Sequence, residues 1–483
     1  MTRLLVIKIK KYINLGIFYH PLFLVFFYLL CHVLVSFFLN DTLQVDDREQ
    51  IFIGQEFQFG YNIPQPPMYS WISFLFFEMF GANITSLLAL KYILIFLNFT
   101  FIFKTSEIIF KKNLNAVSIS TLSFLLLPSF FWHMHQGFTH TILLGLGIAM
   151  SIHYLFRLSL DKSLANYLLF GFSLSIGLLG KYSFVIFIFL ILLTVISIKE
   201  FRDIFQNKFF FYTLALIFLL ISPHYIWLLN NWPNIYPMAA ERLIASSGTS
   251  FFMILLEFIK ASIGFLFPYI LFIFFKVNSN YKGTKKIIEK FLENYLYFII
   301  IFGILFLAIF DIKEIKVRWL HPILMIVPFW ISIKIVNKNP SRALLKIFYI
   351  SLFVISLIIL TIRIVQNTYA PKLGYQGRVN TPIIETLKMI PVSVLDKVSL
   401  IRTDDYFLGP HLFSVFNEKD IQILNKKFQA NLNEDRKCLI IWDDDSYDDN
   451  HNLKFSSYTG ILTNNRNPKP YNLFYKILDI NEC

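Results

Sequence analysis

A cluster of charged side chains follows the first long apolar run of the chain. Its members are Asp46, Asp47, Arg48 and Glu49. A carboxylate in such a cluster can act as general base toward a hydroxyl group, or it can stabilise a sugar-like cation by its charge. Gly60-Tyr61 and Pro66-Pro67 close the same stretch, so we expect a loop with short helical pieces. An isolated acidic run more often indicates a solvated connector, and the rest of the chain decides between these interpretations.

Three cations accompany aromatic residues further along the chain. They are Lys181, Arg242 and Arg318. Tyr182 follows the lysine, and Trp319 follows the last arginine. Each cation could merely anchor its segment at the membrane interface, where lysine side chains snorkel and aromatic belts form. Together on one face they would also bind a diphosphate or phosphodiester, because arginine offers a planar fork and lysine a point charge.

Two further groups contain residue types that bind metal ions but lack the pattern of a metal site. His133, His135 and His140 lack a supporting carboxylate or cysteine motif, which disfavours zinc. Asp443-Asp444-Asp445 follows an expected strand, where a solvated turn is favoured over calcium. The three cysteines of the chain form no closely spaced framework for disulfides or a thiolate site. We therefore predict no cofactor and leave dependence on a divalent metal open.

The composition indicates a polytopic membrane protein. Of the 483 residues, 56% are hydrophobic and 16% are charged, whereas soluble proteins contain roughly 25% charged residues. Apolar runs such as 16–38 and 209–229 reach or approach the ~20 residues that cross a bilayer, and we count about eleven spans. The first run lacks a small-residue cleavage site and so does not predict a cleavable signal. The net charge of +13 lies mostly in short loops, so we predict no nucleic-acid partner.

The positions of lysine and arginine set the orientation of the chain. Basic residues before the first span place the N-terminus in the cytoplasm, which leaves the loop at 40–70 and the C-terminal segment outside. The segments with unusual composition then all fall on the outer side, and we expect a functional cavity there. They are residues 46–67, 133–140, 181–182, 232–242 and 313–318.

The change of composition along the chain predicts two domains. Residues 1–366 form an α-helical membrane domain, with 40–70 as its catalytic outer loop. In residues 367–483, short apolar runs at 398–401 and 438–442 alternate with polar turns and one amphipathic helix. This pattern predicts a small α/β domain outside the cytoplasm.

The order of several short motifs resembles a known family. The motifs are Asp46-Asp47, Gly60-Tyr61, Pro66-Pro67, Gly177-Leu178-Leu179-Gly180-Lys181-Tyr182, Pro223-His224-Tyr225-Ile226-Trp227 with Arg242, Arg318-Trp319-Leu320-His321-Pro322 and Gly377-Arg378-Val379-Asn380-Thr381-Pro382. They resemble the bacterial branch of the dolichyl-phosphate-mannose–protein mannosyltransferase family, to which the lipid A aminoarabinose transferases are related. The resemblance implies the GT-C fold, a polyprenyl-phosphate sugar as donor, and transfer with inversion to an acceptor outside the cytoplasm.

The resemblance also implies roles for individual residues. Asp46 takes the place of the catalytic base, and Asp47 stands where glutamate is usual, so the choice between these two catalytic candidates stays open. His140 stands where relatives often have an aspartate, which leaves a non-catalytic relative open as well. The residues expected to contact the substrates are Glu49, Tyr61, Pro66, Pro67, His140, Lys181, Tyr182, Arg242, Arg318 and Trp319.

The favoured prediction is a glycosyltransferase of the bacterial inner membrane, with Lys181, Arg242 and Arg318 near the lipid phosphate of the donor. A transporter or flippase of lipid-linked intermediates stays open. Such proteins often show repeated halves and charges at the bilayer midplane, whereas this sequence shows no repeated halves and its charges gather at one face. A non-catalytic envelope assembly protein that binds partners through its outer domain is the other alternative. The sequence leaves the sugar, the acceptor and the oligomeric state open.

Overall fold

The computed structural model describes most of the chain. Within the described helices and strands, the side chains of 234–235, 238–243, 342 and 426–428 are not described. The predicted basic N-terminus and the first part of the predicted outer segment 313–318 lie outside the described residues. The described residues are 20–40, 42–61, 65–111, 113–243, 251–274, 286–309, 315–337, 342–375, 380–405, 408–416, 419–423, 426–428, 437–443, 459–465 and 470–479.

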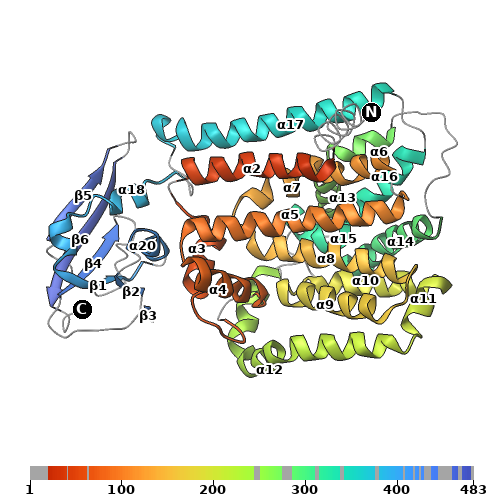
Figure 1. Ribbon diagram of the computed structural model, residues 1–483, viewed down its shortest axis with the longest axis horizontal. Helices are drawn as coiled ribbons and strands as arrows, with labels where there is room; N and C mark the ends of the chain where they lie inside the picture. The colour runs from red at the N-terminus through yellow and green to blue at the C-terminus, as the bar shows by residue number, and fades with distance from the viewer. Residues whose placement is uncertain are drawn as a thin grey trace, which may run out of the picture. The chain divides into compact units, whose positions relative to one another are not determined.

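Apolar helices dominate the chain, as the sequence predicts (Figure 1). Among the described residues, six helices are long and apolar enough to cross a membrane, and three bent helix pairs raise the number to as many as nine. The polytopic helical class is confirmed, and the larger predicted number of spans stays a prediction. The six long helices are α2 (Pro21–Leu39), α5 (Ile84–Ile109), α8 (Thr139–Leu158), α12 (Phe209–Leu243), α14 (Lys286–Ile309) and α17 (Arg342–Thr368).

The bent pairs and the shorter helices complete the membrane region. The bends measure 68°, 117° and 66° in chain order. The pairs consist of α6 (Leu114–Leu122) and η1 (Ser123–Leu126) with α7 (Pro128–Phe131) and η2 (His133–His135), of α10 (Phe184–Ile196) with α11 (Lys199–Phe205), and of η4 (Val317–Leu320) and α15 (His321–Leu324) with α16 (Val327–Asn337). The shorter helices are α3 (Val45–Ile53), α4 (Met68–Phe80), α9 (Leu164–Gly180), α13 (Phe251–Leu266) and η3 (Tyr269–Phe274).

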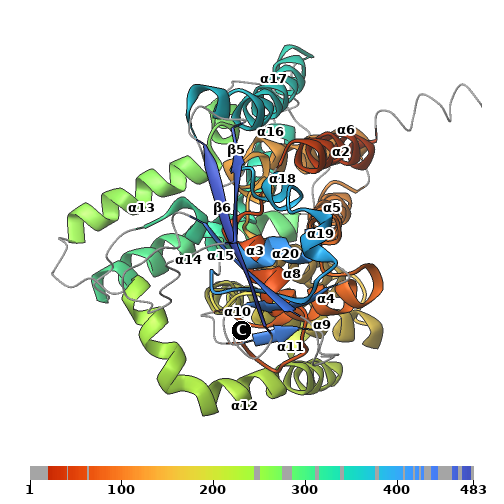
Figure 2. The ribbon, with the colours of Figure 1, turned by 90° about the vertical axis from the view of Figure 1, so that its left-hand side faces the viewer.

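α12 is longer than the sequence predicts. The predicted span ends near residue 229 and continues as an outer loop, whereas the helix runs on to Leu243. Pro223, Pro233 and Pro237 lie inside it, and each removes a backbone donor from the helical ladder. Figure 2 shows α12 turning along its length, which is how helices accommodate internal proline. The predicted loop at 230–243 is therefore wrong in its secondary structure.

Contacts between Cα atoms divide the chain into two compact units, which we call unit 1 and unit 2. Unit 2 contains both the acidic cluster and the C-terminal sheet. Unit 1 comprises Met1–Cys31, Gln58–Tyr69 and Lys91–Ile359, and unit 2 comprises His32–Phe57, Ser70–Leu90 and Leu360–Cys483.

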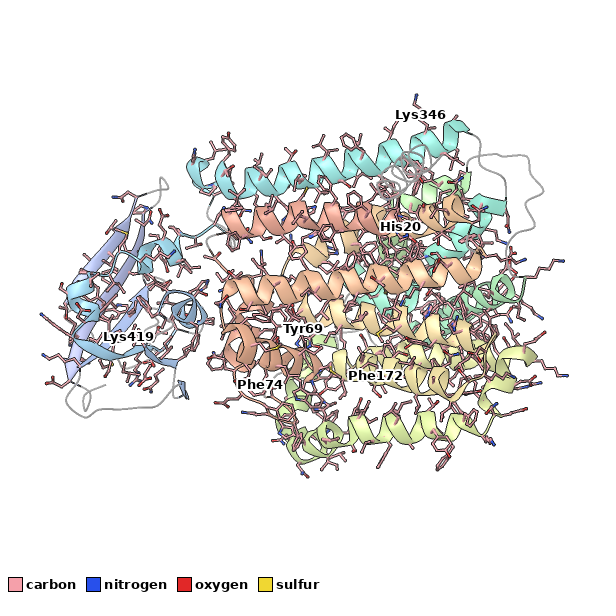
Figure 3. All side chains as sticks on the ribbon, in the orientation of Figure 1. His20, Tyr69, Phe74, Phe172, Lys346 and Lys419 are labelled. Atoms are coloured by element: carbon pink, nitrogen blue, oxygen red, sulfur yellow. The ribbon has the colours of Figure 1, made fainter. Side chains whose placement is uncertain are left out.

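α8 and α9 pack closely at the centre of unit 1. A Cβ atom added at Gly147 would lie 2.5 Å from the Cα atom of Gly177, so the two backbones meet at these glycines. Small residues permit such close approach between membrane helices. Phe172 of α9 is 42% exposed and so lies at the outside of the unit (Figure 3). The packing fixes the end of α9, from which Lys181 follows.

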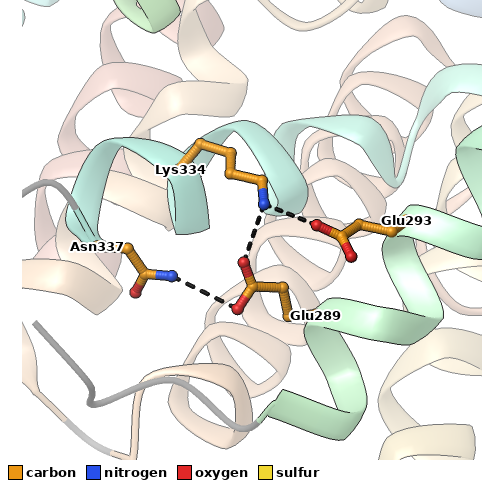
Figure 4. A network of polar contacts seen from close by, with 4 residues as sticks. All are labelled: Glu289, Glu293, Lys334 and Asn337. Carbon is orange, nitrogen blue, oxygen red and sulfur yellow. Dashed lines mark hydrogen bonds and ion pairs between the residues drawn. The ribbon is translucent and has the colours of Figure 1, made fainter. Parts of the chain in front are cut away.

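An ion-pair network joins α14 to α16 in unit 1 (Figure 4). Lys334 Nζ lies 3.0 Å from Glu289 Oε1 and 2.7 Å from Glu293 Oε1. Asn337 Nδ2 donates to Glu289 Oε2 at 3.5 Å. The lysine charge is therefore matched by two carboxylates from a neighbouring helix.

The C-terminal region of unit 2 forms a mixed sheet, which confirms the predicted α/β character. The strand order is β3-β2-β1-β4-β6-β5; β1 pairs in parallel with β2 and β4, and the other pairs are antiparallel. The helices η5 (Pro371–Leu373), α18 (Ile383–Leu387), α19 (Val392–Leu395) and α20 (Gly409–Val415) accompany it. The strands are β1 (Val398–Thr403), β2 (Asp420–Ile423), β3 (Lys426–Phe428), β4 (Lys437–Asp443), β5 (Gly460–Asn464) and β6 (Tyr471–Asp479).

Cys438 of β4 is disulfide-bonded, whereas Cys31 is free. The spacing of the cysteines did not predict this bond. Cys438 is fully buried and packs with Leu400 and Ile440 in the core of the sheet.

Candidate active site

The acidic cluster begins a short helix in unit 2. α3 carries Asp46 and Asp47 in its first turn, and Gln44 before it makes no side-chain cap. Carboxylates in a first turn stabilise a helix through its dipole. Asp46 and Glu49 are partly exposed, whereas Asp47 is 4% exposed. Asp46 is therefore the more accessible of the two candidate bases.

Hydrogen bonds within unit 2 hold α3 in place. Leu43 N donates to Nε2 of His411, a residue of α20, at 3.1 Å. Arg48 Nε donates to Leu43 O at 3.0 Å, and Ser70 Oγ donates to Gln50 Oε1 at 3.0 Å. All five residues are buried. The position of the carboxylates thus depends on side chains from distant parts of the sequence.

The predicted glycine and proline pairs lie in unit 1. A Cβ atom at Gly60 would overlap the ring of Trp227 on α12, so a larger residue would displace the loop or the ring. Tyr61 is 4% exposed, and Pro66 and Pro67 are buried before α4. These residues fix the course of the loop.

Lys181 lies at the corner between α9 and α10. Its Nζ atom donates to Thr141 Oγ1 at 2.8 Å, and His140 Nδ1 donates to the carbonyl oxygen of Gly180 at 3.3 Å. Thr141 belongs to the first turn of α8, which begins at Thr139. The positive end of the α8 dipole therefore lies beside the ammonium, and both would stabilise an anion.

Tyr182 connects this corner to the loop at Gly60. His224 Nδ1 donates to Phe59 O at 2.9 Å, because a carbonyl oxygen can only accept, and Tyr182 Oη donates to His224 Nε2 at 3.1 Å. Burial raises the pKa of the Tyr182 phenol and so keeps its proton. The His224 ring also stacks with the rings of Tyr182 and Trp227.

Arg318 of η4 joins the same region of unit 1. Its guanidinium carbon lies 5.4 Å from the ring centre of Phe138, and the His133 ring lies 5.5 Å from that centre. His321 follows Arg318 by three positions, and its helix α15 packs against α8 and α10. Within the described residues, Arg318 has no carboxylate partner. We call Lys181, Arg318, His133, His140 and His321 the cation cluster.

The other predicted residues contribute less to this geometry. Trp319 is partly exposed, and Lys316 Nζ lies 5.6 Å from its ring centre. Arg242 lies at the end of α12, and its side chain is outside the described part of the chain. No three His, Cys, Asp or Glu side chains among the described residues are grouped closely enough to hold a metal ion.

Two groups of known proteins are similar in sequence to this chain. The family described as dolichyl-phosphate-mannose-protein mannosyltransferase matches residues 64–227. The lipopolysaccharide core galacturonosyltransferase RgtB of Rhizobium johnstonii is 25% identical over 430 residues, which cover 86% of this chain and 85% of RgtB. RgtA of the same organism is 28% identical over 205 residues, which cover 42% of this chain and 40% of RgtA.

The fold is that of a solved transferase. The crystal structure of ArnT from Cupriavidus metallidurans bound to undecaprenyl phosphate matches with a TM-score of 0.57 at 11% identity, over 93% of this chain and 97% of ArnT. Its apo structure gives the same values. The chain is a membrane glycosyltransferase with the GT-C fold. The predicted fold and enzyme class are confirmed.

The predicted substrate residues of this glycosyltransferase divide between the two units. Unit 1 holds Lys181, His140 and Arg318 in the cation cluster, with Tyr182 beside it. Asp46, Asp47 and Glu49 lie on α3 in unit 2. Their individual roles stay predictions.

Sequence reasoning missed three polar residues of unit 1. Thr141 binds Lys181, His224 binds Tyr182, and His321 belongs to the cation cluster. His224 and His321 stand inside motifs that carried the family resemblance, so histidines within those motifs were the available signal. Thr141 gave no signal, because its role depends on a residue 40 positions away.

Proposed function

We propose that this glycosyltransferase moves a sugar from a polyprenyl-phosphate carrier to a glycolipid acceptor outside the cytoplasm. The reaction inverts the anomeric carbon. Residues 1–366 form the membrane domain that binds the carrier, and residues 367–483 form an outer domain. The protein lies in the bacterial inner membrane with its N-terminus in the cytoplasm.

The observation that carries this proposal is the cation cluster of unit 1. Lys181 donates to Thr141 on the first turn of α8, and Arg318 has no carboxylate partner in the part of the chain that the structure describes. Two cations and a helix N-terminus together supply the positive potential that a phosphate needs. The undecaprenyl phosphate bound to ArnT supports a polyprenyl phosphate as the phosphate-bearing ligand.

The relatives suggest which sugar and acceptor to test first. RgtB and RgtA are named as galacturonosyltransferases of the lipopolysaccharide core. We propose a uronic acid as the transferred sugar and a lipopolysaccharide core as the acceptor. RgtB aligns with most of this chain, which favours the same class of reaction.

The chemistry of the step follows from the residue types. The acceptor hydroxyl gives its proton to Asp46, and its oxygen forms a bond to the anomeric carbon. The bond from that carbon to the phosphate oxygen breaks, and its electron pair stays on the departing polyprenyl phosphate. Lys181 and Arg318 stabilise the charge that develops on this leaving group. Asp47 is more deeply buried and orients the first turn of α3.

The disulfide of Cys438 supports the proposed sidedness of the outer domain. Disulfides persist in oxidising compartments such as the bacterial periplasm and are rare in the cytosol. Cys438 lies on β4 in the C-terminal sheet. Labelling of free thiols in intact cells, with and without reductant, would report this bond where the protein works.

The test is a transfer assay on the purified protein in lipid nanodiscs. Galacturonosyl and other sugar-linked polyprenyl phosphates serve as donors, lipopolysaccharide core as acceptor, and released polyprenyl phosphate is measured. We expect Asp46→Asn to lower turnover by about a thousandfold, as loss of a general base and its charge does. Asp396→Asn is the matched control, because Asp396 is exposed and lies in unit 2.

The same assay distinguishes the roles of Asp46 and Asp47. Asp47→Asn should lower turnover less than Asp46→Asn if Asp46 is the base. Normal transfer by Asp46→Asn would exclude the role proposed for Asp46. Failure of the wild type with every donor, together with failure to bind polyprenyl phosphate, would overturn the proposed function.

A further inference from the structure

His321 is a buried histidine whose two ring nitrogens lack hydrogen-bond partners among the described residues. The residue is 1% exposed, and both Nδ1 and Nε2 are buried. Buried polar atoms are nearly always hydrogen-bonded, since leaving one unpaired costs roughly 1–3 kcal/mol. Two such atoms on one side chain indicate that a ligand or water completes them.

The surroundings of His321 contain a second incomplete imidazole. The Nδ1 atom of His133 is likewise buried without a partner in the described part of the chain. The ring of Phe138 contacts both His133 and Arg318. His321 follows Arg318 by three positions, and its helix α15 packs against α8 and α10, the helices beside Lys181. The two imidazoles therefore belong to the same region of unit 1 as both cations.

The hydrogen-bonding capacity of these imidazoles differs from that of the cations. Lysine and arginine only donate, which suits phosphate oxygens. A neutral imidazole has one donor and one acceptor nitrogen, and two cations nearby work against a further positive charge. A phosphate diester can satisfy the donor nitrogen but has no proton for the acceptor nitrogen. A sugar hydroxyl can both donate and accept, so it satisfies either nitrogen.

We propose that His321 and His133 form the subsite for the sugar of the donor, beside the phosphate subsite of Lys181 and Arg318. This inference rests on the proposed function and assigns the part of the donor that each side chain contacts. His321 is then a residue that determines donor specificity. The ligand of this subsite is a hydroxyl-bearing sugar ring attached to the lipid phosphate.

The protein alone offers no equivalent explanation for His321. Its one described ring contact is a T-shaped one with Phe265, with centroids 5.2 Å apart, and no hydrogen bond of its ring nitrogens is described. A metal role is not supported, because no group of three potential ligands occurs among the described residues. Phenylalanine would make the same packing contact without the cost of buried polar atoms.

The test compares two lipids that differ only in the sugar. Binding of polyprenyl phosphate and of sugar-linked polyprenyl phosphate is measured on full-length protein in nanodiscs. We expect His321→Phe to weaken binding of the sugar-linked lipid about tenfold or more, the loss expected for one or two ligand hydrogen bonds. Binding of plain polyprenyl phosphate should stay within about twofold of the wild type, since Lys181 and Arg318 supply the contacts to the phosphate.

Two further variants protect the test against a folding defect. His321→Gln keeps one donor and one acceptor and should recover part of the sugar-linked affinity. His153→Phe alters a buried histidine of a different helix, α8, whose charged neighbours are Lys104 and Arg157. This variant should change the affinity for neither lipid. Equal loss of both lipids in His321→Phe, with His153→Phe normal, would overturn the sugar subsite and leave the proposed function standing. A wild type that binds neither lipid would instead overturn the proposed function, and the subsite with it.

Discussion

Two lysines of unit 1 lie in contrasting electrostatic surroundings. Lys334 is placed between Glu289 and Glu293, at 3.0 and 2.7 Å (Figure 4). Lys181 donates to the neutral hydroxyl of Thr141 on the first turn of α8, in the cation cluster.

We propose that the contrast separates a structural cation from one that serves a ligand. Two carboxylates match the Lys334 charge within the protein, so this side chain joins α14 to α16 without a ligand. Arg318 has no carboxylate partner among the described residues, and the buried imidazole nitrogens of His321 have no partner there either. Such an arrangement is stabilised when an anion enters. The contrast also explains why membrane depth alone does not make a lysine functional.

The largest expected effect is a loss of sugar transfer in Lys181→Ala, which Lys334→Ala should not share. Lys181→Ala should lower turnover by about a hundredfold or more, because charge developing on the leaving phosphate loses its counter-charge. Lys334→Ala should keep turnover within about threefold when measured per folded molecule. Transfer rates of both variants in nanodiscs check this. Equal loss in the two variants would break the comparison.

Arg318→Lys should have an intermediate effect on transfer. The charge remains, but the planar fork that binds two phosphate oxygens is lost. We expect kcat/KM to fall roughly tenfold to thirtyfold. Lys260→Arg, an exposed change on α13, is the control. Unchanged kinetics in Arg318→Lys would show that Arg318 does not bind the phosphate as a fork.

Lys334→Met should affect stability and not chemistry. It leaves two carboxylates facing each other, and we expect a loss of about 1–2 kcal/mol in unfolding free energy. Thermal unfolding in detergent measures it, and adding Glu293→Gln should restore part of the loss. An unfolding free energy of Lys334→Met equal to that of the wild type would contradict the structural assignment of Lys334.

The smallest effect is expected for Tyr182→Phe. This change removes the hydrogen bond to His224 and leaves the stacked ring in place. We expect turnover to fall about threefold to tenfold, the usual value of one hydrogen bond. Tyr225→Phe, next to His224, is a matched control on the same helix. A loss as large as that of Lys181→Ala would assign Tyr182 to the chemistry itself.

The sequence predicts the elements of this fold better than their contacts. The long apolar runs at 16–38 and 209–229 predict α2 and the first part of α12, because about twenty apolar residues have few alternatives to a membrane helix. Alternating short runs predict β1 and β4. The extent of α12 was not predicted, since proline is read as a helix breaker and tertiary packing decides whether a bent helix continues.

A residue of the candidate site could be predicted only where its type was unusual for its place in the sequence. Lys181 stands between two apolar runs, and a charge in that position is a strong signal. The hydrogen bond between Tyr182 and His224 joins residues 42 positions apart, and that between Leu43 and His411 joins residues 368 positions apart. No local pattern encodes such pairs. The incomplete hydrogen bonding of His321 appears only once burial is known.

Binding of polyprenyl phosphate to the wild type, Lys181→Ala and Lys334→Ala in nanodiscs tests the central claim most directly. The claim is that the cation cluster binds the phosphate of a lipid carrier. We predict saturable binding to the wild type and to Lys334→Ala, and about tenfold or greater weakening in Lys181→Ala. Binding to Lys181→Ala as tight as to the wild type would contradict the account.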